Sequence, residues 1–288
     1  MFQPSLFRVP TENDGLKTYR HLRGDPAAAF YYKDKAMYPW LDLDLLHIRC
    51  EEEKTESVLW EGHPAVKYTA VLFSGNNSAE AHQNTRLGSY TRIAVQAGET
   101  GPLMLDVTFD LDPALPELPK VGLSAQIPAC YDTIGWFGEG PHESYPDRRA
   151  GAFLGRWEHS IIGADTGLET PYIVPQENGN RMGVRRIRLS ERHVPPGQHI
   201  PQEYPRSITI APDKPVMMSA SRYTPENMLA ALHTHELEDV SIGENGYYFL
   251  NIDCAQRGVG TGTCGPDTLD QYRVRPGLFT MRLYFYEE

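Results

Sequence analysis

Carboxylate, amide and arginine side chains gather in two short segments that are rich in glycine and proline. The first segment runs from Gly135 to Arg148 and the second from Tyr172 to Gly179. Glycine and proline at this density predict an irregular corner rather than a helix or a plain strand. Glu143, Glu177 and Asn178 would then lie at the rim of a sheet, where they can hydrogen-bond the hydroxyl groups of a sugar. The alternative is a purely structural corner that Asp–Arg pairs hold in place.

A second glycine-rich stretch, Gly258–Pro266, has a glycine spacing faintly like that of a phosphate-binding loop. No Gly-Lys-Ser/Thr follows it and no helical pattern begins there, so we do not expect a nucleotide site. The glycines would instead let the backbone come close to a ligand or to a neighbouring domain. Thr261, Thr263, Cys264 and Gly265 are therefore candidate contact residues.

Two further groups of residues offer metal ligands. His233 and His235 would share one face of a strand, and Glu12, Asn13 and Asp14 carry oxygen atoms suited to Ca²⁺ or Mg²⁺. No third ligand accompanies the histidines at a recognisable spacing, and acidic and amide residues are common in turns. We therefore predict no metal site, and we keep His235 as a candidate rim residue.

Composition excludes several classes of function. The 288 residues carry a net charge of −11 and no Lys/Arg run that could follow a phosphate backbone, so nucleic acid is not an expected partner. The N-terminus lacks a basic region followed by an apolar stretch, and no window approaches about 18 uninterrupted apolar residues. Neither a signal peptide nor a membrane span is expected. The four cysteines form no Cys-x-x-Cys pair, which favours reduced thiols in a cytoplasmic protein.

Alternation of apolar and polar residues predicts half-buried strands along most of the chain. These strands are expected within residues 41–73, 91–97, 103–112, 121–127, 182–189, 207–211, 216–223 and 272–286. Glu51–Glu56 is interpreted as a charged link between two strands, and Leu115–Lys120 as a connection because its prolines exclude a helix interior. Ser74–Thr85 and Ser190–Pro205 are predicted to be surface loops.

Only Thr224–His233 has a helical pattern, with Thr224 as the N-cap and Pro225 at the first helical position. Many short strands, regular turns and one short helix predict an all-β fold, a large sandwich of two antiparallel sheets. No repeat or composition shift divides the chain. We therefore expect one domain over residues 1–288, in which residues 1–40 form an N-terminal strap.

Several motifs, taken together and in this order, resemble the C-terminal domain of glycoside hydrolase family 2 β-galactosidases, also called domain 5 or the small chain. They are Phe7-Arg-Val-Pro-Thr-Glu-Asn-Asp14, Gly140-Pro-His-Glu-Ser-Tyr-Pro-Asp-Arg148, Arg156-Trp157, Pro175-Gln-Glu-Asn-Gly179, Arg222-Tyr-Thr-Pro-Glu226, Leu232-His-Thr-His235, Leu250-Asn-Ile-Asp253 and Gly258-Val-Gly-Thr-Gly262. The first motif lacks the family's second aromatic residue. The resemblance covers almost the whole chain, and it implies the supersandwich fold that this domain shares with galactose mutarotases.

The resemblance also implies a role. Retaining glycosidases need two carboxylates about 5–5.5 Å apart, which this family carries on a separate (β/α)₈ barrel, and the chain has no βα repeat that could form one. The expected function is thus carbohydrate binding that completes the pocket of a β-galactosidase, in a chain that is inactive alone. The implied partners are a barrel-bearing large subunit or domain and a terminal β-D-galactoside such as lactose, and the lone chain could form a homo-oligomer. No cofactor is expected in this chain, since Mg²⁺ or Na⁺ would belong to the barrel.

The chain departs from the family at the glycine-rich loop. In better-known members the equivalent loop carries an acidic pair and a tryptophan that forms part of the galactoside pocket. Thr263, Cys264 and Gly265 occupy those places here, so an aromatic sugar platform is absent from this position. Other branches of the family resemble this chain in using Gly-Thr-x-x-Cys-Gly-Pro.

Two other functions stay open. An aldose 1-epimerase-like enzyme on the same fold would need a base and an acid, and His233 or His235 with Glu177 could fill those roles. A non-catalytic carbohydrate-binding module would use Trp136, Trp157 and Tyr172 as stacking platforms if their rings are exposed.

Overall fold

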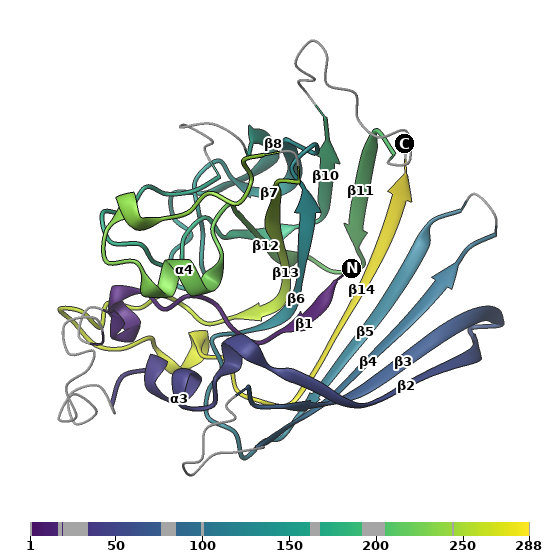
Figure 1. Ribbon diagram of the computed structural model, residues 1–288, viewed down its shortest axis with the longest axis horizontal. Coiled ribbons are helices and arrows are strands. Elements are labelled where there is room, and N and C mark those ends of the chain that lie inside the picture. The colour runs from purple at the N-terminus through teal and green to yellow at the C-terminus, as the bar shows by residue number, and fades with distance from the viewer. Residues whose placement is uncertain are drawn as a thin grey trace.

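Two antiparallel β-sheets form the body of the protein in a computed structural model (Figure 1). The structure describes residues 2–16, 19, 34–75, 85–98, 101–161, 168–191, 205–243 and 245–287. Within these residues one sheet has nine strands and the other has five. The predicted all-β architecture of two packed antiparallel sheets is therefore confirmed. None of the helices in these ranges is long and apolar enough to cross a membrane.

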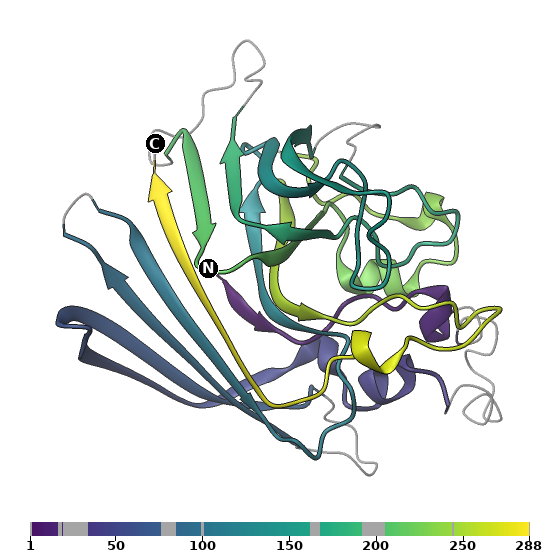
Figure 2. The ribbon, with the colours of Figure 1, turned by 180° about the vertical axis from the view of Figure 1, so that it is seen from behind.

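The nine-stranded sheet has the order β2-β3-β4-β5-β14-β11-β10-β7-β8, and its long strands fan out on one side of the molecule (Figure 2). The bounds are β2 Arg49–Trp60, β3 His63–Phe73, β4 Arg86–Gln96, β5 Leu103–Leu111, β7 Thr133–Gly140, β8 Phe153–Ser160, β10 Arg186–Ser190, β11 Ser207–Pro212 and β14 Leu278–Glu287. In β5 the residues Leu105, Val107, Phe109 and Leu111 are buried and alternate with more exposed ones. This alternation places one face of the sheet against the core.

The five-stranded sheet has the order β1-β6-β13-β12-β9. The bounds are β1 Gln3–Ser5, β6 Lys120–Pro128, β9 Arg181–Val184, β12 Val216–Ser221 and β13 Tyr247–Gln256. Val121, Leu123 and Ala125 of β6 belong to the buried apolar residues. Because side chains alternate along a strand, Lys120, Gly122 and Ser124 lie on the opposite face. We call this face, away from the nine-stranded sheet, the outer face of the five-stranded sheet.

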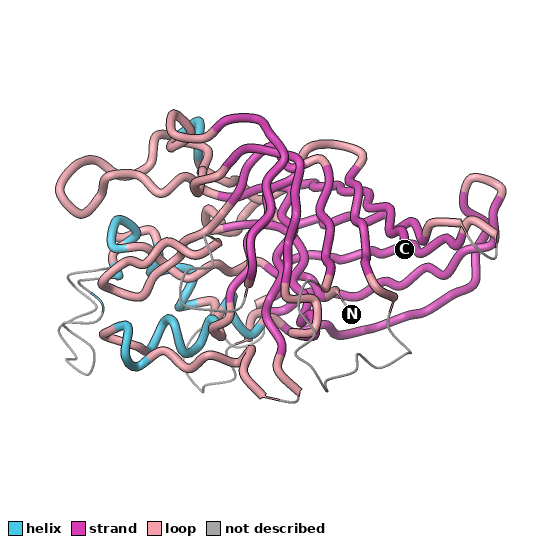
Figure 3. The backbone as a smooth tube through the Cα atoms, turned by 90° about the horizontal axis from the view of Figure 1, so that it is seen from above, coloured by secondary structure: helices cyan, strands magenta, loops and turns pink. Residues whose placement is uncertain are grey.

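Short helices and loops lie against this outer face, on one side of the strands (Figure 3). The helices with bounds in the described ranges are α3 Met37–Asp42 and α4 Pro225–Ala230, with the 3₁₀ turns η1 Glu12–Asp14, η2 Leu45–His47, η3 Thr234–Glu236 and η4 Asp270–Tyr272. The α4 helix begins as predicted, with the Thr224 side chain accepting a hydrogen bond from the Asn227 amide and Pro225 at its start. The expectation of a single helix is wrong, because α3 was not predicted.

Two other expectations for the first strands are also wrong. Leu41–Ile48 was predicted to be a strand, but it spans the end of α3 and η2, in which Leu43 and Leu45 are both buried. The alternation in this stretch therefore reflects inward-pointing side chains on successive turns. Glu51–Glu56 is not a link but the middle of β2. Because β2 is an edge strand of its sheet, charged residues there face water and discourage pairing with other chains.

The glycine-rich segment around Trp136 is more regular than predicted. Residues up to Gly140 form β7, and the irregular corner begins only at the cis peptide bond between Gly140 and Pro141. A Cβ atom at Gly138 would lie 2.8 Å from the Cα of Val184, and one at Gly140 would lie 2.7 Å from the Trp157 ring. These glycines therefore permit close packing of a strand instead of interrupting it. The predicted loops at Ser74–Thr85 and Ser190–Pro205 lie mostly outside the described residues.

Buried ion pairs attach the N-terminal segment to the rest of the fold. The β1 strand pairs with β6, and residues further along carry the completely buried Asp14. The Asp14 carboxylate accepts hydrogen bonds from Arg8 at 2.7 Å and from Arg257 at 3.2 Å. The guanidinium groups of Arg8 and Arg257 lie 5.3 Å and 5.8 Å from the centroid of the Trp40 ring. Segments that are far apart in sequence thus meet around one carboxylate.

Candidate functional site

A cavity of about 810 Å³ opens among four loop segments, and we call it the loop cavity. Its lining residues come from around Thr11–Asn13, Tyr145–Arg148, Tyr172–Glu177 and Val259–Tyr272. The segments predicted to carry chemistry, namely the Gly/Pro-rich corner and the glycine-rich loop, are therefore neighbours in space. Among the candidate residues, Glu177, Thr261 and Thr263 line this cavity.

Asp147 and Asn13 hold the glycine-rich loop in position. The Asp147 carboxylate accepts hydrogen bonds from the amides of Val259 at 2.9 Å and Gly260 at 2.7 Å. The Asn13 side chain donates to the Gly260 carbonyl at 2.8 Å and accepts from the Thr263 amide at 3.0 Å. A Cβ atom at Gly258 would lie 2.6 Å from the Asp147 carboxyl carbon. Glycine is therefore required there for the carboxylate to approach the backbone.

Glu143 is held inside the corner. Its carboxylate accepts hydrogen bonds from the Tyr172 hydroxyl at 2.5 Å and the Gly179 amide at 2.7 Å, and it pairs with Arg148. Only 8% of its side chain is exposed. Asn178 is engaged similarly, since it accepts from the Thr170 amide and donates to the Gln176 carbonyl. Glu143 therefore joins the two halves of the corner, whereas these bonds of Asn178 lie within residues 170–178.

Glu177 has a different environment, because it lines both the loop cavity and a second cavity on the outer face of the five-stranded sheet. Its carboxylate accepts a hydrogen bond from the Gln256 side chain at 3.3 Å. Removal from water raises the pKa of Glu177 to about 7, although the positive charges of Arg8 and Lys120 oppose the rise. This carboxyl can therefore be protonated or ionised near neutral pH.

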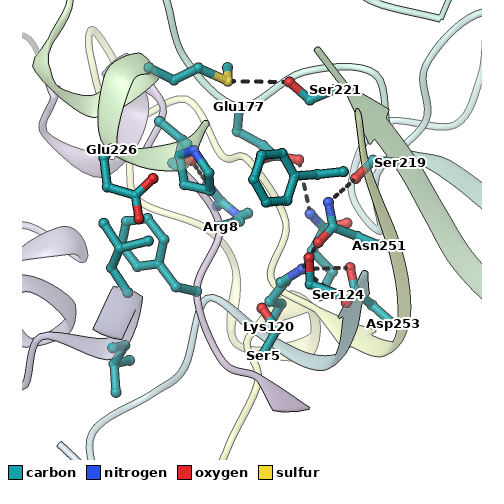
Figure 4. A pocket seen from close by; sticks show the side chains of 18 of the residues that line it. Ser5, Arg8, Lys120, Ser124, Glu177, Ser219, Ser221, Glu226, Asn251 and Asp253 are labelled. Atoms are coloured by element: carbon teal, nitrogen blue, oxygen red, sulfur yellow. Dashed lines mark hydrogen bonds and ion pairs between the residues drawn. The ribbon is translucent and has the colours of Figure 1, made fainter. Parts of the chain in front are cut away.

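The second cavity, which we call the sheet cavity, has a volume of about 210 Å³. It lies between the outer face of the five-stranded sheet and a cover formed by the N-terminal segment, Leu45–Ile48 and the start of α4. Lys120, Ser124, Asn251 and Asp253 gather on its sheet side, and Glu177 points towards them (Figure 4). None of these four residues was a candidate site residue in the sequence, although Asn251 and Asp253 belong to the Leu250–Asp253 motif.

Asn178 also lines the sheet cavity, whereas His235, Cys264 and Gly265 lie apart from the two cavities. His235, in η3, is exposed and stacks on His233 with ring centroids 5.5 Å apart, and it lines neither cavity. The amides of Cys264 and Gly265 donate to the Thr261 carbonyl at 3.1 and 2.7 Å in an exposed turn, outside the lining of the loop cavity. The epimerase pairing of either histidine with Glu177 is thus not assembled.

The proposed aromatic platforms are largely covered. Trp136 is 3% exposed and belongs to the core, and Trp157 packs against that core. The Tyr172 hydroxyl is bonded to Glu143 and Arg148. Of these three residues, Tyr172 lines the loop cavity, and neither tryptophan lines the loop cavity or the sheet cavity.

Of the three side chains considered for a cation, those of Asn13 and Asp14 are engaged in protein contacts, and Glu12 lines the loop cavity. Asp14 pairs with Arg8 and Arg257, and the Asn13 side-chain oxygen accepts from Thr263. No group of three or more His, Cys, Asp or Glu residues in the described ranges has an arrangement that could hold a metal ion.

The side chains in the loop cavity can hydrogen-bond a ligand but are poorly placed to act as a pair of catalytic carboxylates. Asp147 bonds two amides, Asp267 pairs with Arg257 at 2.7 Å, and Glu177 is bonded to Gln256. Thr261 and Thr263 add hydroxyl groups, and the ring of Tyr172 adds an apolar surface. The arrangement favours recognition of a polar ligand over bond cleavage.

Comparison with known proteins agrees with the motifs. A family model described as "Beta galactosidase small chain" matches residues 1–285. A β-galactosidase from Vibrio cholerae is 32% identical over 284 residues, which is 98% of this chain and 23% of that enzyme. A β-galactosidase from Erwinia tasmaniensis is 30% identical over 285 residues, which is 96% of this chain and 23% of that enzyme. The chain thus spans about a quarter of the length of these relatives.

Two solved structures show only a remote likeness. A putative aldose 1-epimerase from Escherichia coli has a TM-score of 0.37 and 12% identity, covering 82% of this chain and 68% of that protein. A galactose mutarotase-like protein from Lactobacillus casei has a TM-score of 0.32 and 12% identity, covering 82% and 73%. Likeness at this level supports no argument about function. The family match, which extends over nearly all of the sequence, confirms the resemblance predicted from the motifs, and the chain belongs to the β-galactosidase small-chain family.

Proposed function

We propose that this chain is the small subunit or terminal domain of a β-galactosidase and helps to bind a terminal β-D-galactoside. In this proposal the catalytic carboxylates lie on a separate barrel-bearing chain or domain. The match to about a quarter of two relatives named β-galactosidase supports the need for a larger partner. The fold supports it as well, because the described strands form antiparallel sheets and no βα repeat.

One observation carries the proposal. The Gly258–Pro266 loop is held by side chains that are distant in sequence. Asp147 bonds Val259, which is 112 residues away, and Asn13 bonds Thr263, which is 250 residues away. Such fixation holds Thr261 and Thr263 at the edge of an open cavity that both polar and apolar groups line. A preorganised loop of this kind suits a surface that completes a binding pocket, since ligand binding then orders little additional structure.

A reconstitution assay tests the proposal. The purified chain alone should not hydrolyse a chromogenic β-galactoside, whereas a mixture with the barrel-bearing chain or domain should do so. An active lone chain would refute the assignment of the carboxylates to a partner. An inactive mixture, in which association of the two parts is demonstrated by analytical ultracentrifugation, would refute the pocket-completing role.

The Asp147→Ala variant tests the loop itself. It removes two charge-assisted hydrogen bonds, each worth about 1.5–3 kcal/mol, and should lower kcat/KM of the mixture by about tenfold or more at saturating small chain. Asp110→Ala is the matched control, because Asp110 is an exposed carboxylate on β5 that does not line the loop cavity. Equal activity of the two variants would show that the loop makes no contribution.

A further inference from the structure

The outer face of the five-stranded sheet carries a polar row across three adjacent strands. In the strand register Ser124 of β6 lies opposite Asn251 of β13, which lies opposite Ser219 of β12. The Asn251 side chain donates to the Ser219 hydroxyl at 3.2 Å and accepts from the Lys120 ammonium group at 2.9 Å. Side chains on three strands are thereby arranged in one connected network.

A buried ion pair adjoins this row. Lys120 and Asp253 have side chains that are 3% and 1% exposed, and they lie 3.1 Å apart. Gly122 lies opposite Asp253 in the register, and a Cβ atom there would lie 2.1 Å from an Asp253 carboxylate oxygen. Glycine therefore leaves space for the carboxylate on this face. Removing two charges from water costs desolvation free energy, which their mutual attraction only partly offsets. Apolar side chains would therefore stabilise this face of the sheet at least as well.

A polar outer face of a sheet ordinarily meets water, but this one is covered. The N-terminal segment with Arg8, Leu45–Ile48 and α4 with Met228 lie over it and enclose about 210 Å³. A volume of this size equals that of roughly seven liquid waters. Polar groups on the sheet side and apolar groups from the cover, such as Phe7 and Met228, line it together.

Hydrogen-bonding capacity in the sheet cavity is left unused. Gln256 is 3% exposed and lines the cavity, and its side-chain oxygen has no hydrogen-bond partner. Its nitrogen donates to Glu177, whose carboxylate lines the same space. An unpaired buried polar atom costs free energy, and a ligand hydroxyl or water could satisfy it. Burial raises the pKa values of Glu177 and Asp253 to about 7 and about 6, because it removes both carboxylates from water.

We propose that the sheet cavity is a binding site for one small, uncharged polyhydroxylated molecule, such as a monosaccharide or a polyol. Hydroxyl groups both donate and accept, as the mixture of carboxylate, amide, ammonium and hydroxyl groups requires. The charges of Lys120 and Asp253 already balance, and Arg8 is paired with Asp14. An anionic ligand would lie beside Glu177 and Glu226 in this space, whereas hydroxyl groups can donate to or accept from these carboxyl groups.

The proposal stands independently of the role suggested for the whole chain. It needs no partner and no turnover, and it concerns a cavity that shares only Glu177 and no loop residue from 258–266 with the loop cavity. An inactive reconstituted mixture would leave it intact, and a failure to bind polyols in the sheet cavity would leave the reconstitution result intact.

Isothermal titration of the purified chain with D-galactose, myo-inositol and glycerol tests the proposal. At least one probe should bind with one-to-one stoichiometry. Ser124→Phe should fill the cavity and weaken that binding at least tenfold, and the smaller Ser124→Val, whose β-branched side chain suits a strand, should have the same direction of effect. Gln126→Phe is the matched control, since Gln126 is exposed, on the same face of β6 and outside the cavity.

Absence of binding by all three probes up to tens of millimolar would overturn the proposal. So would binding that both Ser124 variants retain but Asn13→Ala abolishes, because that result assigns the ligand to the loop cavity. Circular dichroism of each variant checks folding. If Ser124→Phe is unfolded, the Ser124→Val result decides between the two outcomes.

Discussion

Replacing Glu177 by glutamine should make the protein more stable at neutral and alkaline pH. The carboxyl is surrounded by protein, and burial raises its pKa to about 7 from 4.5. Unfolding exposes it to water, where it ionises at its ordinary pKa. Between these two values a rise in pH therefore ionises the unfolded chain but not the folded one, and stability is lost. Glutamine keeps the shape and can still accept the hydrogen bond from Gln256.

The size of the effect follows from the two pKa values. One pKa unit corresponds to about 1.4 kcal/mol, so the shift of Glu177 corresponds to roughly 3 kcal/mol at full strength. The residue is not completely buried, which reduces this value, and we expect a gain of about 2 kcal/mol for Glu177→Gln at pH 8. Below the ordinary pKa both states are protonated, so the variant and the parent should be equally stable at pH 4.

Urea denaturation at pH 4, 5, 6, 7 and 8 measures the difference in the free energy of unfolding. The difference should grow from about zero to about 2 kcal/mol across this range and then level off. Glu238→Gln, at an exposed carboxylate, controls for the loss of one negative charge from a chain of net charge −11. A difference that does not change with pH would refute the assigned environment of Glu177.

Three further predictions concern other features. Asp14→Asn should lower the free energy of unfolding by about 3–5 kcal/mol in urea, because it leaves the buried Arg8 without a counter-charge, although Arg257 keeps its pair with Asp267. Gly122→Ala should lower Tm, because the added Cβ would clash with the Asp253 carboxylate. Gly151→Ala is the control, since an added Cβ there meets nothing within 4 Å. Equal Tm values of the two variants would contradict the close approach of Asp253 to Gly122. Cys264 is the exposed thiol of four unpaired cysteines, so Ellman's reagent should label one thiol quickly in the native chain and four in denaturant.

Alternation alone predicted the strands whose two faces differ in environment. Residues 103–112 alternate between core and solvent, and β5 occupies them almost completely. The same rule was wrong where burial arose differently. Leu43 and Leu45 point inward from turns, and the charges of Glu51–Glu56 belong to an edge strand. The sequence pattern alone does not show that Leu43 and Leu45 are buried from turns, nor that Glu51–Glu56 lies at the edge of a sheet.

The candidate site was predicted in part for a related reason. Glu177, Thr261 and Thr263 lie in motifs with unusual Gly/Pro content, and they share the loop cavity. Lys120 and Asp253 were not chosen as site residues, because they lie 133 residues apart and only the register of β6 with β13 brings them together. His235 was selected for its chemistry, yet its exposed turn carries it away from both cavities.

The position of β14 has a consequence for how the chain folds during synthesis. This strand lies between β5 and β11 and joins residues 49–111 of the nine-stranded sheet to the part built from β7, β8, β10 and β11. Until residues 278–287 leave the ribosome, the edges of β5 and β11 have no partner. At about 5–20 residues per second, the β5 edge would remain available to other nascent chains for roughly ten seconds or longer. Factors that shield strand edges should therefore raise the yield of this chain more than additives that stabilise its folded state.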